Sequence, residues 1–184
     1  MRHKMNGDII NFSNSQQILN YLVEDPNKEF LASEIQKATG LSKAGIYRAL
    51  EELTSRELIT RHERGRFVLY KAVSDDCVIR QFKVLKTAIF LKALVERLKP
   101  LARKIVLFGS AARGEDSKES DIDLLIVSKD PDGTERIMSG FKSKRKIQAV
   151  IKTSSQLAKF EGENKEFINE INSGIILWEE RDER

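Results

Sequence analysis

Residues 106–127 read VLFGSAARGEDSKESDIDLLIV. Two apolar runs, residues 105–108 and 122–127, enclose a polar segment that begins with a glycine and a serine. Short apolar runs bounded by polar, glycine-containing sequence are typical of buried β-strands. Asp121 and Asp123 stand at the start of the second run, and residues i and i+2 of a strand point to the same face. The sequence therefore predicts two carboxylates side by side at the mouth of a buried strand.

Two neighbouring carboxylates favour a divalent metal site. They repel each other, and each raises the pKa of the other unless positive charge lies between them. A pair of divalent ions held by shared carboxylates removes this repulsion, and phosphoryl and nucleotidyl transfer use that arrangement. We therefore predict two Mg²⁺ ions at Asp121 and Asp123. The alternative is an ordinary hairpin whose acidic side chains are merely solvated.

The spacing of the motif resembles that of a known family. Gly109-Ser110, then ten residues, then Asp121-Ile122-Asp123 is similar to the pattern of the minimal nucleotidyltransferases, which belong to the superfamily that includes DNA polymerase beta. The resemblance implies that Asp121 and Asp123 are catalytic residues and metal ligands. It also implies a nucleotide-binding set at the same motif: Gly109, Ser110, Arg113 and Ser120.

Three of these residues have chemistry that suits a triphosphate. Gly109 has no Cβ, so a phosphate can approach its backbone closely. We expect Ser110 to start a helix, whose first-turn N–H groups and dipole favour phosphate oxygens. Arg113, one turn further along, adds a charge-assisted contact. With ATP as substrate, the resemblance implies that a hydroxyl attacks the α-phosphate and releases pyrophosphate.

The same resemblance implies an activity and a class of partner. The predicted function is transfer of a nucleoside monophosphate, AMP from ATP, to a hydroxyl of a protein or RNA acceptor. Minimal members of the family are often paired with a HEPN-type toxin partner, so an antitoxin role is an expectation for this chain.

One position departs from the family pattern. The family adds a third carboxylate on a neighbouring strand, and in the strand predicted over residues 146–152 that position holds Gln148. Glutamine is neutral and a poor base. Three readings stay open: Glu161 or Glu163, in the loop beyond, replaces the acid; the acceptor brings its own base; or the domain binds nucleotide without turnover. The last reading makes the chain a catalytically silent, nucleotide-sensing transcriptional regulator.

The N-terminal part resembles a second family. Apolar spacing and caps predict helices over residues 15–23 and 30–38 and after Ser42, followed by strands at 57–61 and 66–70. This order is similar to the winged-helix domain of prokaryotic transcription regulators. The alternative is a module that packs against a partner protein or forms a homodimer. The resemblance implies that double-stranded DNA is bound by the third helix and the wing, through Lys43, Tyr47, Arg48, Arg64 and Arg66.

The predicted architecture therefore has two domains. A winged helix-turn-helix DNA-binding domain of α+β class covers residues 10–74, and a connecting helix covers residues 75–100. A minimal nucleotidyltransferase domain with an α/β fold and a small mixed sheet covers residues 101–184. Its last part is predicted to hold helices at 134–141 and 164–172 and a short strand at 175–178.

Composition and charge indicate the cellular compartment and the kind of partner to expect. The chain has 184 residues, a net charge of +4 and one cysteine, Cys77, which suits a reducing cytoplasm. No apolar run approaches the ~20 residues that span a bilayer, so no membrane association is expected. Residues 77–104 hold 8 Lys and Arg but a single acidic residue. Such a basic segment indicates either a nearby polyanion or a solvated helix face.

Overall fold

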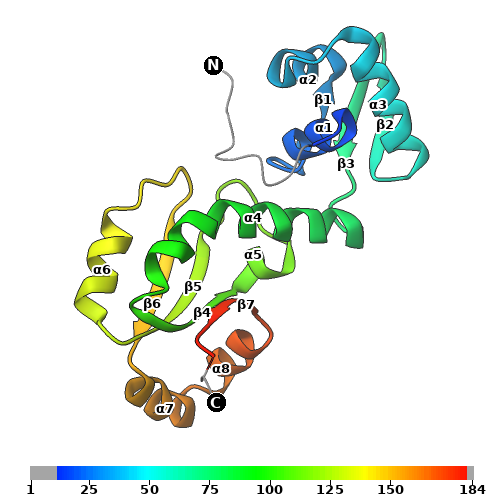
Figure 1. The fold of residues 1–184 in the computed structure, drawn as a ribbon. Helices are drawn as coiled ribbons and strands as arrows, with labels where there is room; N and C mark the ends of the chain where they lie inside the picture. Colours follow the sequence, from blue (N-terminus) through cyan, green and yellow to red (C-terminus); the bar gives the residue numbers. More distant parts are fainter. Residues whose placement is uncertain (1–11, 182–184) are drawn as a thin grey trace. The chain divides into compact units, whose positions relative to one another are not determined.

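A computed structural model of the chain describes residues 12–181 and, within them, all side chains except those of residues 160–163. The chain divides into two compact units, residues 1–79 and residues 80–184, and each is considered by itself (Figure 1). Among the described residues, no helix is long and apolar enough to cross a membrane.

Residues 12–76 of the first unit form three helices and a three-stranded antiparallel sheet with the order β1-β3-β2. Ser13 caps α1 and Ser42 caps α3, each by accepting a backbone N–H of the first turn with its hydroxyl. The helices bury one apolar stripe each, which includes Ile18, Ile35 and Leu50. The elements are α1 (Asn14–Leu22), β1 (Phe30–Leu31), α2 (Ala32–Thr39), α3 (Lys43–Ser55), β2 (Ile59–Arg64) and β3 (Phe67–Ala72).

Two predictions for this unit were wrong in detail. Phe30 and Leu31 form a short strand rather than the first turn of a helix, because they pair with Tyr70 and Leu69 of β3. The hairpin strands also run about two residues later than predicted. Glu57 has a left-handed φ of 59°, so the strand begins only at Ile59. The turn after Arg64 contains a glycine with φ of +61°.

The second unit is built on a four-stranded mixed sheet with the order β6-β5-β4-β7. The β5–β6 pair is parallel and the β4–β5 and β4–β7 pairs are antiparallel, so the predicted α/β class with a mixed sheet is confirmed. The elements are α4 (Cys77–Leu98), β4 (Ala102–Phe108), α5 (Gly109–Arg113), β5 (Ile122–Ser128), α6 (Pro131–Ser139), β6 (Ile147–Lys152), α7 (Ser154–Glu163), α8 (Lys165–Asn172) and β7 (Ile175–Glu179). Helix α4 begins in the first unit and continues into the second.

Alternating side chains bury both faces of this sheet. On one face, Ile105 and Leu124 pack with residues of α4 and α6. On the other, Phe108 and Leu125 pack with residues of α7 and α8. Burial on both faces explains why β4 and β5 are almost continuously apolar.

Two helices of this unit differ from the prediction. Helix α6 begins at Pro131 rather than at residue 134, because the Asp130 carboxylate caps it by accepting the Gly133 N–H at 3.0 Å. Residues 154–163, predicted as a loop, form α7. In α4, Leu85 is exposed, whereas Lys83 is almost fully buried.

Candidate active site

The two predicted catalytic carboxylates lie at the start of β5. Asp123 pairs in register with Phe108 of β4 on one side and with Gln148 of β6 on the other. It shares a strand face with Leu125, which packs under α7 and α8. Asp121 lies two residues earlier, directly before β5. Asp123 therefore belongs to the face of the sheet that α7 and α8 cover.

The backbone of Gly109 lies close to the carboxylate of Asp123. It has a φ of +71°, and a Cβ built there would lie 2.6 Å from Asp123 Oδ2. A larger residue would therefore be strained and would push the carboxylate aside. Helix α5 begins at Gly109, one residue before the predicted start, so Ser110 lies within the first turn.

The site concentrates negative charge. Burial, followed by the charges of Asp121 and Glu170, raises the pKa of Asp123, while Lys146 acts in the opposite direction. Lys146 Nζ lies 2.5 Å from Asp121 Oδ2. Its side chain is largely exposed. Lys146 thus partly offsets the negative charge of the two aspartates.

The residues present fit a magnesium ion that is shared with a triphosphate. Mg²⁺ in phosphate-transfer sites takes one or two carboxylates, and substrate phosphates and water complete its shell. Asp121 and Asp123 supply such a pair. Among the described residues, no group of three or more His, Cys, Asp or Glu side chains could hold a metal ion by itself. The donor set therefore suits an ion that binds together with a nucleotide rather than a protein-only cage.

The side chains of Arg113 and Ser120, which were predicted to bind nucleotide, are engaged in contacts with other residues of the chain. Arg113 Nε donates to Glu115 at 2.8 Å, and its Nη1 lies 3.7 Å from Glu170 Oε1. The Ser120 hydroxyl accepts the Ser117 N–H at 2.9 Å and so closes a local turn. One end of the β4–β5 pair brings together Gly109, Ser110 and the two aspartates. Ser120 instead stabilises the loop that leads to Asp121. Nucleotide binding by these residues stays a prediction.

A buried charge cluster, which the sequence did not indicate, fixes that loop. Lys83 Nζ lies 3.2 Å from Asp116 Oδ1 and also donates to the Asp116 backbone carbonyl. Arg145 Nη1 lies 2.7 Å from Asp116 Oδ2, and Arg145 Nη2 donates to the Ser120 carbonyl at 3.0 Å. Asp116 and Lys83 are only 5% and 6% exposed. The cluster ties the segment before Asp121 to α4 and to the residues before β6.

The position of the missing third acid is as predicted, since Gln148 lies directly beside Asp123 in the sheet and is exposed. Glu161 and Glu163, the predicted substitutes, belong to α7 rather than to a loop, and their side chains lie outside the described ones. Among the described side chains, the acid outside the motif whose charge reaches Asp123 is Glu170 of α8. Sequence reasoning missed it, because only the packing of α8 brings it near the motif.

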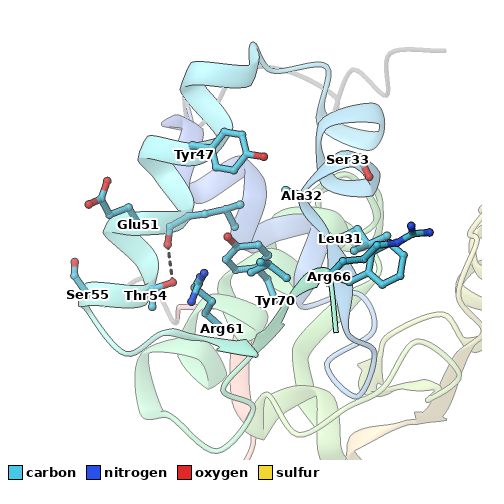
Figure 2. A pocket seen from close by; sticks show the side chains of 13 residues that line it. Leu31, Ala32, Ser33, Tyr47, Glu51, Thr54, Ser55, Arg61, Arg66 and Tyr70 are labelled. Carbon is cyan, nitrogen blue, oxygen red and sulfur yellow. Dashed lines mark hydrogen bonds between the residues drawn. The ribbon is translucent and has the colours of Figure 1, made fainter. Parts of the chain in front are cut away.

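The first unit carries the predicted DNA-binding residues on its surface. A hollow of about 730 Å³ lies between α2, α3 and the β2–β3 hairpin, and Figure 2 shows Tyr47, Arg61 and Arg66 around it. Tyr47 is 52% exposed, and the Arg66 guanidinium stacks 5.1 Å from the centre of the Phe67 ring. The acidic Glu51 lines the same hollow.

The other three predicted residues do not line this hollow. Lys43 and Arg48 are exposed on α3. Arg64 is exposed at the turn of the hairpin and pairs with Glu29 at 3.4 Å. Arg61 and Phe67, which sequence reasoning did not select, lie in the hollow. DNA binding by any of these side chains stays a prediction.

The second unit thus combines a mixed sheet with two neighbouring aspartates beside a helix that begins at a glycine. The model of the nucleotidyltransferase domain family matches residues 88–181, and the chain belongs to that family. A protein of Methanocaldococcus jannaschii that carries the provisional name protein adenylyltransferase MJ0604 is 53% identical over 38 residues. That match covers 21% of this chain and 38% of the relative. No solved structure matches the chain.

Proposed function

We propose that the second unit transfers AMP from ATP to a hydroxyl of a protein or RNA acceptor, and that the first unit binds double-stranded DNA. The observation that carries the transfer reaction is the meeting of Gly109 with the carboxylate of Asp123, beside Asp121. This geometry puts a backbone that a phosphate can approach closely beside two carboxylates that would bind metal.

The residues of the site divide the work of transfer. Asp121 and Asp123 would hold two Mg²⁺ ions with the triphosphate, and bound metal supplies charge neutralisation and a lower pKa for the attacking hydroxyl. Gly109 and the first turn of α5, with Ser110, receive phosphate oxygens. Arg113 exchanges its contacts with Glu115 and Glu170 for the phosphates. The acceptor oxygen then bonds to the α-phosphorus, and pyrophosphate leaves.

The acceptor is a hydroxyl on another macromolecule. The name of the M. jannaschii relative favours a protein hydroxyl. By family resemblance, a HEPN-type toxin is the partner to examine first, which would make this chain an antitoxin. We place the reaction in the cytoplasm, where ATP and such partners are present. An RNA end is the second class of acceptor.

The transfer reaction is tested with α-labelled ATP, Mg²⁺, the full chain and a lysate of the source organism. We expect label on a macromolecule with the wild type and none with the Asp121→Ala/Asp123→Ala double variant. Label that is equal for both proteins, or absent from both, would contradict the proposal. Digestion of the labelled band with protease or RNase identifies the acceptor class.

The proposal for the first unit rests on its surface. The unit has the order helix, strand, helix, helix and hairpin. Winged helices meet DNA through the third helix and the hairpin, and there the unit exposes the cations Lys43, Arg48 and Arg66. The fusion would link nucleotide chemistry to transcriptional control. A homodimer on a palindromic operator is the expected binding form.

DNA binding is tested with duplex fragments upstream of the gene at several salt concentrations. Loss of one phosphate contact should lower the slope of log affinity against log salt by about 1. We expect this change for Arg48→Ala and Arg66→Ala, and an unchanged slope for Lys28→Ala, an exposed lysine of the same unit paired with Glu34. Wild-type affinity that does not depend on salt would refute the DNA-binding role.

A second candidate function is favoured by Gln148. A neutral amide beside Asp123 suits a domain that binds nucleotide without turnover, in a nucleotide-sensing regulator. This candidate predicts Mg²⁺-dependent ATP binding that the double aspartate variant loses, with no label transferred by the wild type. The labelling experiment above separates the two.

A further inference from the structure

The proposed transfer needs a base that the motif itself does not contain. A hydroxyl that attacks phosphorus must lose its proton, and a positioned side chain speeds this step. Asp121 and Asp123 are assigned to the metal. Gln148, on the neighbouring strand, carries an amide that does not accept a proton at neutral pH. A base supplied by this chain would therefore reach the same face of the sheet from another element.

Helix α8 lies against that face, as Figure 1 shows for α8 and β4. Phe108, the cross-strand partner of Asp123, meets the ring of Phe167 edge to face, with ring centres 5.5 Å apart. Ile171, one turn later in α8, is buried in the same apolar cluster. Gly174 follows so closely that a Cβ there would lie 2.6 Å from the Leu107 carbonyl oxygen. These contacts fix α8 beside the strand pair that carries the motif.

Glu170 is the acid that this packing brings to the motif. Its Oε1 lies 3.7 Å from Nη1 of Arg113, which is the last residue of α5. The Glu170 side chain is 42% exposed, so a hydroxyl that arrives from solvent can reach it.

We propose that Glu170 is the catalytic residue that accepts the proton of the attacking hydroxyl, an inference that rests on the proposed nucleotidyl transfer. The acceptor O–H bond breaks, and its proton passes to the Glu170 carboxylate. The oxygen electron pair forms the new bond to the α-phosphorus. The bond from that phosphorus to the bridging oxygen breaks, and its electron pair leaves with pyrophosphate.

A role as base, rather than as a third metal ligand, agrees with the geometry. Among the described side chains, Asp121, Asp123 and Glu170 do not form a group that could hold a metal ion. Arg113 pairs with Glu170 before nucleotide binds, and once Arg113 turns to the phosphates the Glu170 carboxylate is free to accept a proton. Nucleotide affinity should therefore depend on the two aspartates and not on Glu170.

The test compares Glu170→Gln with Glu166→Gln, which changes an exposed acid one turn earlier in α8. Label transfer from α-labelled ATP is measured in the lysate assay. Binding of α,β-methylene-ATP with Mg²⁺ is measured by calorimetry, and melting curves confirm that both variants fold. We expect transfer by Glu170→Gln to fall about 100-fold or more while the affinity stays within about threefold. Glu166→Gln should match the wild type.

A rescue variant shows whether the lost group is a base. Gln148→Asp places a carboxylate on the other side of Asp123, and we expect it to restore transfer at least about tenfold in the Glu170→Gln background. Three results would overturn the assignment: unchanged transfer by Glu170→Gln, a fall in affinity that accounts for its lost transfer, or no rescue. A wild type without transfer would refute the proposed function and this inference together, whereas an active Glu170→Gln variant refutes the inference alone.

Discussion

Replacing Asp116 with Asn should lower the free energy of unfolding of the second unit substantially. The change keeps the size of the side chain but leaves Lys83 and Arg145 without their shared carboxylate. Removing one partner of a buried ion pair costs about 3–5 kcal/mol. Arg145 is 26% exposed and can regain water, whereas Lys83 is 7% exposed and cannot. We therefore expect the low end of that range, about 3 kcal/mol, or a Tm lower by about 14 °C.

The assay is urea denaturation followed by the fluorescence of Trp178, the only tryptophan in the chain. It lies in β7, paired with Ile105 of β4, so it reports on the second unit. Glu119→Gln, an exposed acid of the same loop, is the matched control and should change stability by less than about 0.5 kcal/mol. Lys83→Met combined with Asp116→Asn should be less damaging than Asp116→Asn alone, because no ammonium is then buried without its carboxylate. A loss below about 1 kcal/mol for Asp116→Asn would refute the reasoning.

Two further predictions concern the carboxylate pair. The pKa of Asp123 is raised in the folded protein, so its carboxyl stabilises the fold below its unfolded-state pKa, and this contribution is lost as pH rises through the folded-state pKa. In EDTA, the Tm advantage of Asp123→Asn over the wild type should therefore widen from about pH 4 to about pH 7; a constant difference would contradict this. Gly109→Ala places a Cβ 2.6 Å from Asp123 Oδ2 at a φ of +71°. It should cost about 1–2 kcal/mol and weaken Mg²⁺-ATP binding in calorimetry, and unchanged binding would argue against the close approach.

The sequence was most informative where local chemistry decides the structure. The apolar run predicted a buried strand with Asp121 and Asp123 at its mouth, and β5 begins at Ile122, between the two aspartates. The expected strand for Gln148 also forms, next to Asp123. Continuous apolar runs and an Asp-x-Asp pair are strong local signals, because burial and charge repulsion leave few alternatives.

The remaining features depend on partners far along the chain. Phe30 becomes a strand residue only because Tyr70 lies beside it. Lys83 is buried because Asp116, 33 residues later, is buried with it, and helical periodicity cannot foresee such a pair. Glu170 sits on an ordinary amphipathic helix, and only the packing of Phe167 on Phe108 relates it to the motif. These contacts are set by tertiary packing rather than by local pattern.

The most direct test of nucleotidyl transfer compares α-labelled with γ-labelled ATP in the same lysate assay. Transfer of AMP moves the α-phosphate to the acceptor and releases the γ-phosphate within pyrophosphate. We therefore predict a labelled acceptor with α-labelled ATP and none with γ-labelled ATP, and loss of the label in the Asp121→Ala/Asp123→Ala variant. Label from γ-labelled ATP that depends on the two aspartates would show phosphoryl transfer instead. That result, or no label from either nucleotide, would contradict the account.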